Sequence, residues 1–328
     1  MGGRQVAEKL LEARNLTKYF STKKGLLHAV DKVSFHIDKG ETLGLVGESG
    51  CGKSTTGRVL IRLLEANSGQ ILYKGKDVLK YTAQEMKEAR RKMQIVFQDP
   101  YSSLNPRLTV FELIAEPLYV NSVYKTQKET EARVKELMDT VGLAQRLITT
   151  YPHELDGGRR QRIGVARALA LKPEFIVLDE PVSALDVCIQ AQILNLLKNL
   201  QREFGLTFLF ISHNLSVVKH VSDRIAVMYL GKIVEVSDYK SVFTNPIHPY
   251  SQALLSAIPL AKLDVKRDRV ILEGDIPSPV NPPEGCRFYG RCFYRQEICS
   301  EQTPELLPVG EGRFSACHFS NNLVRRAQ

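Results

Sequence analysis

The residues from Gly47 to Ser54 form the pattern G-x-x-x-x-G-K-S, which can bind a phosphate group. They lie between an apolar run, Thr42–Val46, that predicts a buried strand and a segment, Thr55–Leu64, that predicts a helix. A glycine-rich turn at this place lets backbone N–H groups converge on an anion, next to the positive end of the helix dipole. We expect Lys53 to reach the β- and γ-phosphates of a nucleotide and the Ser54 hydroxyl to bind Mg²⁺. The residues predicted to surround the phosphates are Gly47, Glu48, Ser49, Gly50, Cys51, Gly52, Lys53, Ser54 and Thr55.

Two acidic residues follow a second apolar run, Phe175–Leu178, which also predicts a buried strand. Asp179 stands at the end of that strand, where its carboxylate is expected to hold Mg²⁺ through water. Glu180 comes next and is expected to face the water that attacks the phosphate, as a general base. The pair therefore predicts the hydrolytic half of a nucleotide site.

A glutamine and a histidine each follow a further predicted strand. Gln98 comes after Gln94–Phe97, and we expect it to contact the water shell of the metal as well as any partner of the neighbouring helices. His213 comes after Phe208–Ile211 and is expected to donate a hydrogen bond to the γ-phosphate. A histidine in such a place is usually only a surface residue, so its role depends on the other motifs around it.

The elements that must position these residues alternate between strands and helices. Such alternation is typical of an α/β fold with a mostly parallel sheet covered on both faces. Before it, Leu10–Ile37 alternates apolar and polar residues and predicts antiparallel strands. Within it, Val110–Leu118 and Glu129–Val141 have helical spacing and predict an all-helical insertion.

Two further elements are predicted after the acidic pair. Ala191–Phe204 predicts a helix that ends at Gly205 as its C-cap. Ile225–Tyr229 and Lys232–Val236 predict two strands that pair as a hairpin.

The composition changes from about Ser237, where prolines become frequent and four of the six cysteines occur. Proline interrupts helices and central strands, so this part is expected to be an appended domain with little regular structure. We therefore predict an ATPase-like core over 1–93 and 151–236, a helical subdomain over 94–150 and an extension over 237–328.

The composition of the 328-residue chain is that of a globular protein, with 43% hydrophobic and 25% charged residues. No apolar stretch approaches the roughly 18 residues that cross a bilayer, and no secretory signal is recognisable. We expect a cytosolic protein whose membrane contact comes through a partner. Its net charge of +9 is compatible with nucleic acid or anionic lipid, but the basic residues are scattered, and the densest cluster predicts a solvated helical face.

Two more segments complete a set of motifs. Leu155–Arg159 opens a predicted helix with glycines that can expose backbone amides, and Ser183–Asp186 follows the two acids. In order along the chain, the set resembles an ATP-binding-cassette (ABC) subunit over roughly residues 10 to 236. The matching motifs are Walker A at 47–54, the Q-loop at Gln98, the signature at 155–159, Walker B at 175–180, the D-loop at 183–186 and the H-loop at His213.

This resemblance implies a P-loop NTPase fold with an antiparallel β subdomain, a mostly parallel RecA-like sheet and an α-helical subdomain. It implies ATP and Mg²⁺ as cofactors and a dimer in which Asp156, Gly157 and Gly158 contact the nucleotide of the opposite subunit. It also implies an aromatic residue that stacks on adenine, and the family spacing favours Phe20 over Tyr19 for that role.

Two further segments, 98–106 and 245–250, resemble the ATPase subunits of bacterial oligopeptide and dipeptide importers. The resemblance implies a heterodimer with a sister ATPase at the cytoplasmic face of the cell membrane. It further implies two permeases and, indirectly, an external peptide-binding protein, with no nucleic acid as partner. An alternative is a soluble ABC ATPase that acts on ribosomes or nucleic acid, although this chain has one P-loop and no long heptad run.

The signature departs from the family pattern Ser-Gly-Gly-Gln, since this chain has Asp156 and Arg159 at its two ends. In the family the serine binds the γ-phosphate held by the opposite P-loop. Two unit charges about 4 Å apart repel by roughly 4 kcal/mol at an effective dielectric constant near 20. We therefore predict an asymmetric pair, in which the partner's ATP site is impaired while this chain's own P-loop and Glu180 remain competent.

The four cysteines of the tail are Cys286, Cys292, Cys299 and Cys317, with five, six and seventeen residues between them. Disulfides are not expected in a reducing cytosol, and four thiolates in a loop-rich segment suggest a metal. The spacings differ from those of common zinc sites and resemble the iron–sulfur tail of peptide-importer ATPases, so a [4Fe-4S] cluster is predicted. Zinc and the absence of any metal remain open alternatives.

Overall fold

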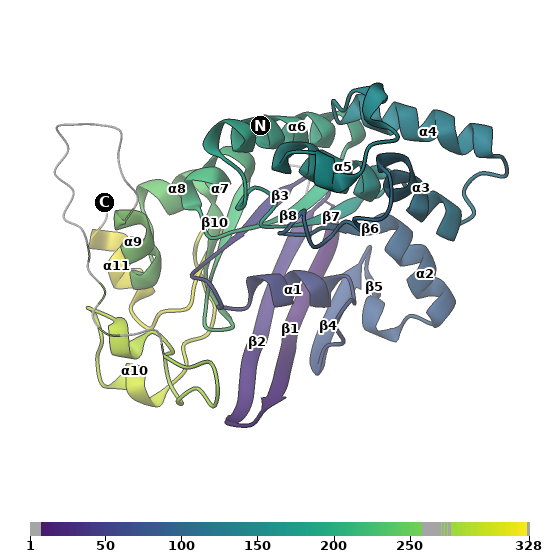
Figure 1. The fold of residues 1–328 in the computed structure, drawn as a ribbon. Coiled ribbons are helices and arrows are strands. Elements are labelled where there is room, and N and C mark those ends of the chain that lie inside the picture. Colours follow the sequence, from purple (N-terminus) through teal and green to yellow (C-terminus); the bar gives the residue numbers. More distant parts are fainter. Residues whose placement is uncertain (1–7, 258–269, 271, 273, 275–276, 327–328) are drawn as a thin grey trace, which may run out of the picture. The chain divides into compact units, whose positions relative to one another are not determined.

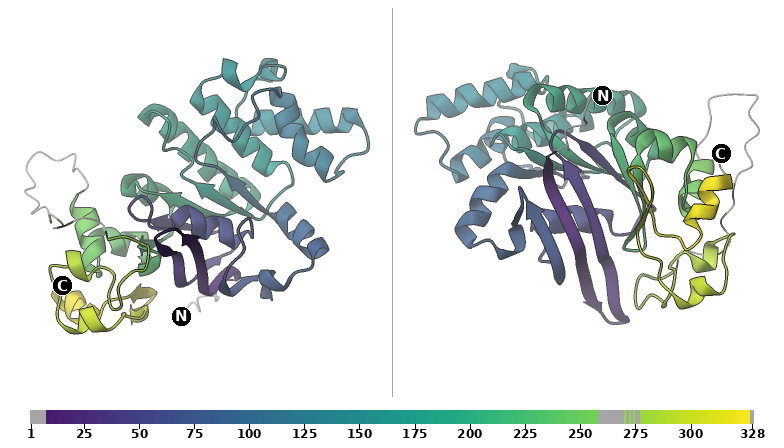
Figure 2. Two further views of the ribbon diagram at one scale, coloured as in Figure 1. Left: turned by 60° about the horizontal axis from the view of Figure 1, so that its bottom comes forward. Right: turned by 180° about the vertical axis from the view of Figure 1, so that it is seen from behind.

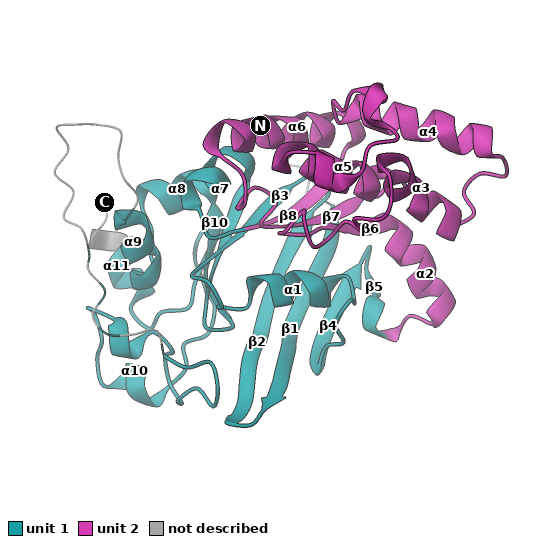
Figure 3. Ribbon diagram, in the orientation of Figure 1, with its two compact units in different colours: residues 1–79, 212–328 teal, residues 80–211 magenta. Residues whose placement is uncertain are grey.

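The computed structural model describes residues 8–257, 270, 272, 274 and 277–326. Its contacts divide the chain into two compact units (Figure 3). Unit 1 consists of Met1–Leu79 and Ser212–Gln328, and unit 2 consists of Lys80–Ile211. These units are defined by contacts within the folded chain and are not the same as the domains predicted from the motifs. The predicted domain ranges stay a prediction.

Unit 1 contains an antiparallel sheet with the strand order β2-β1-β4-β5 (Figure 1). Strand β1 spans Lys9–Thr22 and pairs with β2, Gly25–Asp38, which confirms the predicted antiparallel strands. Its other neighbour is β4, Ser68–Tyr73, which continues into β5, Lys76–Asp77. Leu11 and other apolar residues of β1 are fully buried, so one face of the sheet packs on the core.

Unit 1 also contains the strands β11-β12-β10-β9-β3, in this order. Strand β3, Thr42–Val46, is buried along its whole length and runs parallel to β9, Arg224–Tyr229. A run of buried apolar residues with no polar face is typical of a strand covered on both sides. Strand β9 turns back into β10, Lys232–Asp238, as the predicted hairpin. Helix α7, Leu215–Val221, packs on β3, and helix α1, Lys53–Leu60, contacts β1 and β2.

The tail folds into short elements in unit 1, consistent with its many prolines. Strand β12, Arg313–Ser315, adds to the edge of β10, and β11, Leu307–Gly310, pairs with β12. Leu27 of β2 forms a bridge with Val280, so the tail also lies beside the antiparallel sheet (Figure 2). The remaining tail elements are α8, Tyr239–Thr244; α9, Pro249–Ser256; a 3-10 turn, Tyr289–Arg291; α10, Ile298–Glu301; and α11, Ser320–Arg326.

Unit 2 contains a parallel set of strands in the order β8-β7-β6. These are β8, Thr207–Ser212; β7, Phe175–Asp179; and β6, Met93–Val96. Around them lie α2, Ala83–Lys92; α3, Val110–Val120; α4, Gln127–Thr140; α5, Gly157–Leu169; and α6, Val187–Phe204, with 3-10 turns at Gln145–Leu147 and Pro152–Glu154.

The helices of unit 2 begin and end where side chains satisfy the free backbone groups. Thr109 and Glu112 form a capping box at the start of α3, and Thr126 and Glu129 do the same for α4. Helix α6 ends at Gly205, which has the left-handed conformation, as predicted. Helix α3 packs on both α4 and α5, which confirms the helical insertion. Across the described ranges, each helix is too short or too polar to span a membrane.

Candidate functional site

The predicted phosphate-binding loop, Gly47–Ser54, connects β3 to α1 in unit 1. Gly52 precedes the helix with φ 108°, and a Cβ atom there would lie 2.0 Å from the carbonyl oxygen of Ala29. Only glycine fits this close approach. Lys53 is 4% exposed, and its Nζ donates to the carbonyl oxygens of Gly47 at 2.8 Å and Glu48 at 2.9 Å. The loop thus curls around a buried ammonium group.

This arrangement suits a polyphosphate. Ser49 and Gly50 lie exposed at the tip of the loop, and Ser54 stands half-buried in the first turn of α1. The turn has a free positive end because no side chain caps it. Burial raises the pKa of the Cys51 thiol, so Cys51 packs as a neutral group and does not act as a nucleophile.

Glu48 is held by two residues of the tail, one at its side chain and one at its backbone. Its carboxylate accepts two hydrogen bonds from the Arg291 guanidinium, at 2.9 Å and 3.2 Å. Its backbone N–H donates to the Tyr250 hydroxyl at 2.9 Å. Sequence reasoning missed both partners, because nothing in the local pattern links residues about 200 positions apart.

The two aromatic candidates for adenine stacking differ in their surroundings. Tyr19 stacks on His28 with ring centroids 4.0 Å apart and donates its hydroxyl hydrogen to Asp31 at 2.7 Å. Phe20 is 36% exposed, with the Lys18 ammonium 5.0 Å from its ring centroid. Because Tyr19 is already engaged within the protein, Phe20 is the better candidate to meet a ligand from solvent.

His213 lies exposed between β8 and α7. The next residue, Asn214, caps α7 by accepting hydrogen bonds from two backbone amides in its first turn. This cap fixes the chain immediately after His213.

In unit 2 the two predicted acids stand at the end of β7. Asp179 is fully buried, and Glu180 follows with φ 47° in the left-handed region. A residue other than glycine adopts this backbone conformation only at a cost in free energy, and such residues are typical of functional sites. Gln98 donates its Nε2–H to the Glu180 carboxylate at 3.1 Å, so the structure brings these two predicted residues together.

The signature segment opens α5. Asp156 is the N-cap of this helix, and its Oδ1 accepts from the Arg159 backbone N–H at 2.8 Å. The Arg159 guanidinium lies 3.4 Å from the other carboxylate oxygen. Gly157 and Gly158 follow, and a Cβ on Gly158 would lie 2.6 Å from the Ile189 side chain. The arginine therefore offsets part of the negative charge that the sequence places here.

The predicted nucleotide-site residues divide between the units, and the structure gives the geometry of each half by itself. Unit 1 contains Phe20, the residues from Gly47 to Thr55, and His213. Unit 2 contains Gln98, Asp156, Gly157, Gly158, Asp179 and Glu180.

The four tail cysteines line one small cavity in unit 1. Burial raises the pKa of the Cys286 thiol to about 12 and that of Cys292 to about 11, so both are protonated at neutral pH. Over the parts of the chain that the structure describes, no group of three or more His, Cys, Asp or Glu side chains could hold a metal ion. The structure therefore does not support the predicted [4Fe-4S] site at Cys286, Cys292, Cys299 and Cys317.

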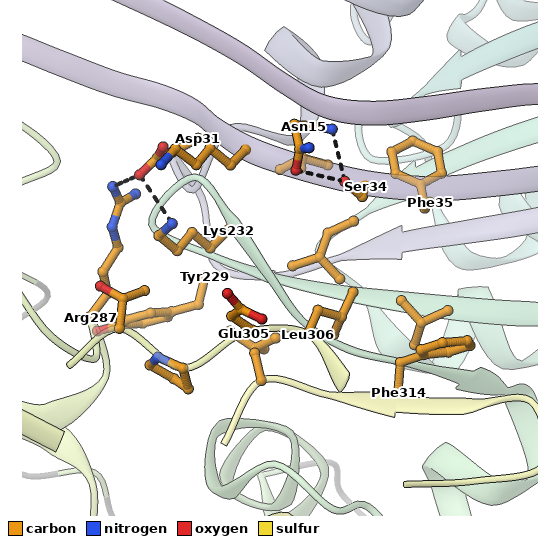
Figure 4. A pocket seen from close by; sticks show the side chains of 18 of the residues that line it. Asn15, Asp31, Ser34, Phe35, Tyr229, Lys232, Arg287, Glu305, Leu306 and Phe314 are labelled. Carbon is orange, nitrogen blue, oxygen red and sulfur yellow. Dashed lines mark hydrogen bonds and ion pairs between the residues drawn. The ribbon is translucent and has the colours of Figure 1, made fainter. Parts of the chain in front are cut away.

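A larger cavity of about 830 Å³ lies between the antiparallel sheet and the tail, and none of its lining residues belongs to the P-loop (Figure 4). The carboxylate of Asp31 lies in the wall of this cavity. It is paired with Arg287 and with the Lys232 ammonium at 3.2 Å, and it accepts from the Tyr19 hydroxyl. These pairs connect the tail to β2 and β10.

A buried histidine makes the stability of the tail sensitive to acid. His248 is 2% exposed, its Nδ1 accepts from the Tyr250 backbone N–H at 3.1 Å, and burial lowers its pKa to about 3. Since the folded pKa lies below the unfolded value near 6.5, the stabilisation is complete above pH 6.5 and is lost as the pH falls toward 3.

We expect the free energy of unfolding to fall by about 2 kcal/mol between pH 7 and pH 5 from this group alone. His248→Asn keeps a hydrogen-bond acceptor but does not titrate. We therefore expect its free energy of unfolding to fall by about 2 kcal/mol less than that of the unmodified chain between pH 7 and pH 5. Urea unfolding of both proteins at the two pH values measures the difference. Equal losses in the two proteins would show that His248 is not the sensitive group.

Comparisons with known proteins agree with the motifs. The ABC transporter family matches residues 30–183, and the family described as the oligopeptide/dipeptide transporter C-terminal region matches residues 234–299. The oligopeptide transport ATP-binding protein AppF of Bacillus subtilis is 52% identical over 322 residues, covering 95% of this chain and 98% of AppF. OppF of the same organism is 58% identical over 266 residues, covering 81% of this chain and 87% of OppF.

Solved structures show the same fold. The dimeric ABC cassette MJ0796, in a post-hydrolysis state with ADP and phosphate, is 29% identical with a TM-score of 0.64. It covers 70% of this chain and 98% of its own. CbiO1 of Clostridium perfringens, part of the ABC transporter complex cbiONQ, is 27% identical with the same TM-score, covering 72% of this chain and 91% of its own.

Proposed function

Because this chain belongs to the ATP-binding-cassette transporter family, as an ATPase coupled to transport, we propose that it powers the import of peptides through membrane permeases. The observation that carries the proposal is that the match to oligopeptide transport ATP-binding proteins covers 95% of the chain. The cassette alone is common to many transporters, whereas residues 234–299 match a region described for oligopeptide and dipeptide transporters.

The P-loop half of the site is proposed to bind the phosphates of ATP. Its backbone amides and the Lys53 ammonium supply positive charge, and the burial of Lys53 strengthens the interaction of its charge with an anion. Lys53 exchanges its bonds to the loop carbonyls for bonds to phosphate oxygens. Phe20 offers an exposed ring to the adenine, and base–aromatic stacking is worth on the order of 1–3 kcal/mol.

The donor set fits Mg²⁺, which prefers oxygen ligands. Ser54 and Asp179 are proposed to hold the ion, with Gln98 at its water shell. Bound there, the ion neutralises charge on the β- and γ-phosphates. Glu180 takes the proton of the attacking water, and the hydrogen bond from Gln98 orients its carboxylate for this role. His213 donates a hydrogen bond to the γ-phosphate.

We propose that the chain acts as a heterodimer with a sister ATPase at the cytoplasmic face of the cell membrane. Asp156, Gly157 and Gly158 then contact the nucleotide held by the partner, and Asp156 impairs that site. The segment from Gln98 to Pro106 passes the motion of the dimer to two permeases, which receive peptide from an external binding protein. An ATPase that acts on ribosomes or nucleic acid is not favoured by the relatives that match the whole chain.

The experiment is reconstitution of the chain with its sister ATPase and two permeases in lipid vesicles. We expect the peptide-loaded binding protein to raise Mg²⁺-dependent ATP hydrolysis above the rate with the empty binding protein. The empty binding protein is the matched control, since it differs only in cargo. A hydrolysis rate indifferent to peptide, together with salt-sensitive binding of RNA, would overturn the proposal in favour of the nucleic-acid alternative.

A further inference from the structure

An acidic residue in a loop that binds polyphosphate needs an explanation. Glu48 is the second residue of the P-loop that is proposed to bind the phosphates of ATP. A carboxylate free to turn toward the phosphates would repel them and weaken ATP binding.

We propose that Arg291 and Tyr250 of the tail are positioning residues for ATP binding, which fix Glu48 and keep its charge from opposing the phosphates. The proposal concerns the nucleotide site of the ABC ATPase and is independent of what the transporter carries. It gives the tail an indirect role in ATP binding, through Glu48.

The Arg291–Glu48 pair has the geometry of a strong interaction. Two guanidinium nitrogens each donate to a different carboxylate oxygen, at 2.9 Å and 3.2 Å. The exposed fractions of the side chains are 10% for Arg291 and 24% for Glu48, so water screens the pair only in part. A bidentate guanidinium neutralises the carboxylate and also fixes its direction.

Tyr250 fixes the backbone of the same residue. Its hydroxyl oxygen accepts the Glu48 N–H at 2.9 Å, and its ring is fully buried. The ring lies 4.6 Å from that of Tyr229 and 5.5 Å from that of Phe288, so the hydroxyl is held by a packed aromatic cluster. The N–H of Gly231, which follows β9, donates to the Cys51 carbonyl oxygen at 2.8 Å and supports the other side of the loop.

The position of Arg291 depends on how the tail folds. Arg291 ends the 3-10 turn that begins at Tyr289, and the next residue, Cys292, is buried in the wall of the thiol-lined cavity. The conformation of this turn therefore sets the position from which the guanidinium meets Glu48.

The test is the Kd of MgATP for the full chain, measured by fluorescence titration. We expect Arg291→Ala to raise the Kd about tenfold, equivalent to about 1.4 kcal/mol. Arg291→Lys keeps the positive charge but cannot donate the two parallel hydrogen bonds of a guanidinium, so we expect the Kd to rise about threefold. Arg295→Ala is the matched control, because it removes an exposed arginine of the same segment and is expected to leave the Kd unchanged. If Arg291→Ala does not fold, Arg291→Gln takes its place in the series.

A second substitution separates charge from architecture. Adding Glu48→Gln to the Arg291 variant removes the unpaired charge, so the Kd is expected to return to within about threefold of the original. A merely structural role would leave the double variant as weak as the single one. The proposal is overturned by that result, or by a Kd for the Arg291 variant no different from that of Arg295→Ala.

Discussion

Glu180→Gln is expected to lower the rate of ATP hydrolysis by a factor of about 10² to 10⁴ while ATP still binds. The Glu180 carboxylate accepts a hydrogen bond from Gln98 at 3.1 Å and sits on a residue held in the left-handed conformation after a buried strand. Glutamine has the same shape and can keep a hydrogen bond, but it cannot take a proton from water. The change therefore removes the base and little else.

Hydrolysis is measured as phosphate release at saturating ATP, and binding as the Kd of MgATP in the same preparation. Glu203→Gln removes an exposed acid from α6 and serves as the matched control, with an expected rate equal to that of the unmodified chain. Residual hydrolysis above a tenth of the original rate would assign the base to another group.

Asp156→Ser is expected to raise ATP hydrolysis about tenfold or more at the site that this signature completes. The carboxylate faces a multiply charged phosphate in the proposed dimer, and Arg159 offsets only part of the repulsion, since both side chains are about half exposed. Serine is also a good N-cap, so the start of α5 is expected to keep its stability. An increase in the rate of hydrolysis would then be due to the removal of the negative charge at position 156.

The measurement compares ATPase rates of the chain alone and with its sister subunit. Asp156→Asn is the matched control for charge, because asparagine has the shape of aspartate and caps helices equally well. Most of the gain is expected from Asn as well. No gain from either variant, in either assembly, would remove the proposed asymmetry.

The sequence predicted the local parts of this protein well. The strand–turn–helix around Gly47–Ser54, the acids after β7 and the hairpin of β9 and β10 were all predicted, because each depends on residues close together in the chain. Helix starts were less well placed, since capping side chains precede the apolar pattern by several residues. Helix α6, for example, begins at Val187, although its apolar spacing predicts a start near Ala191.

Some questions that the sequence left open could be addressed only with the folded structure. The family spacing favoured Phe20 over Tyr19 as the ring that stacks on adenine, which stays a prediction. The structure adds that Tyr19 is engaged with His28 and Asp31. Four cysteines in the tail suggested a metal cluster, and the folded chain places all four around one small cavity. Among the described residues, however, no group of three or more His, Cys, Asp or Glu side chains could hold a metal ion. The cysteine spacing could not reveal this, because the distances between the thiols depend on how the tail folds.

By itself, the sequence identified this chain as an ATPase, because the groups proposed to bind phosphate and activate water occur in short segments with fixed spacing. Only the tertiary structure showed that Arg291 and Tyr250 of the tail hold Glu48 of the P-loop. An ion pair leaves no pattern in the sequence when its partners are far apart along the chain, since any arginine could meet any glutamate. Packing of the tail within unit 1 brings this pair together.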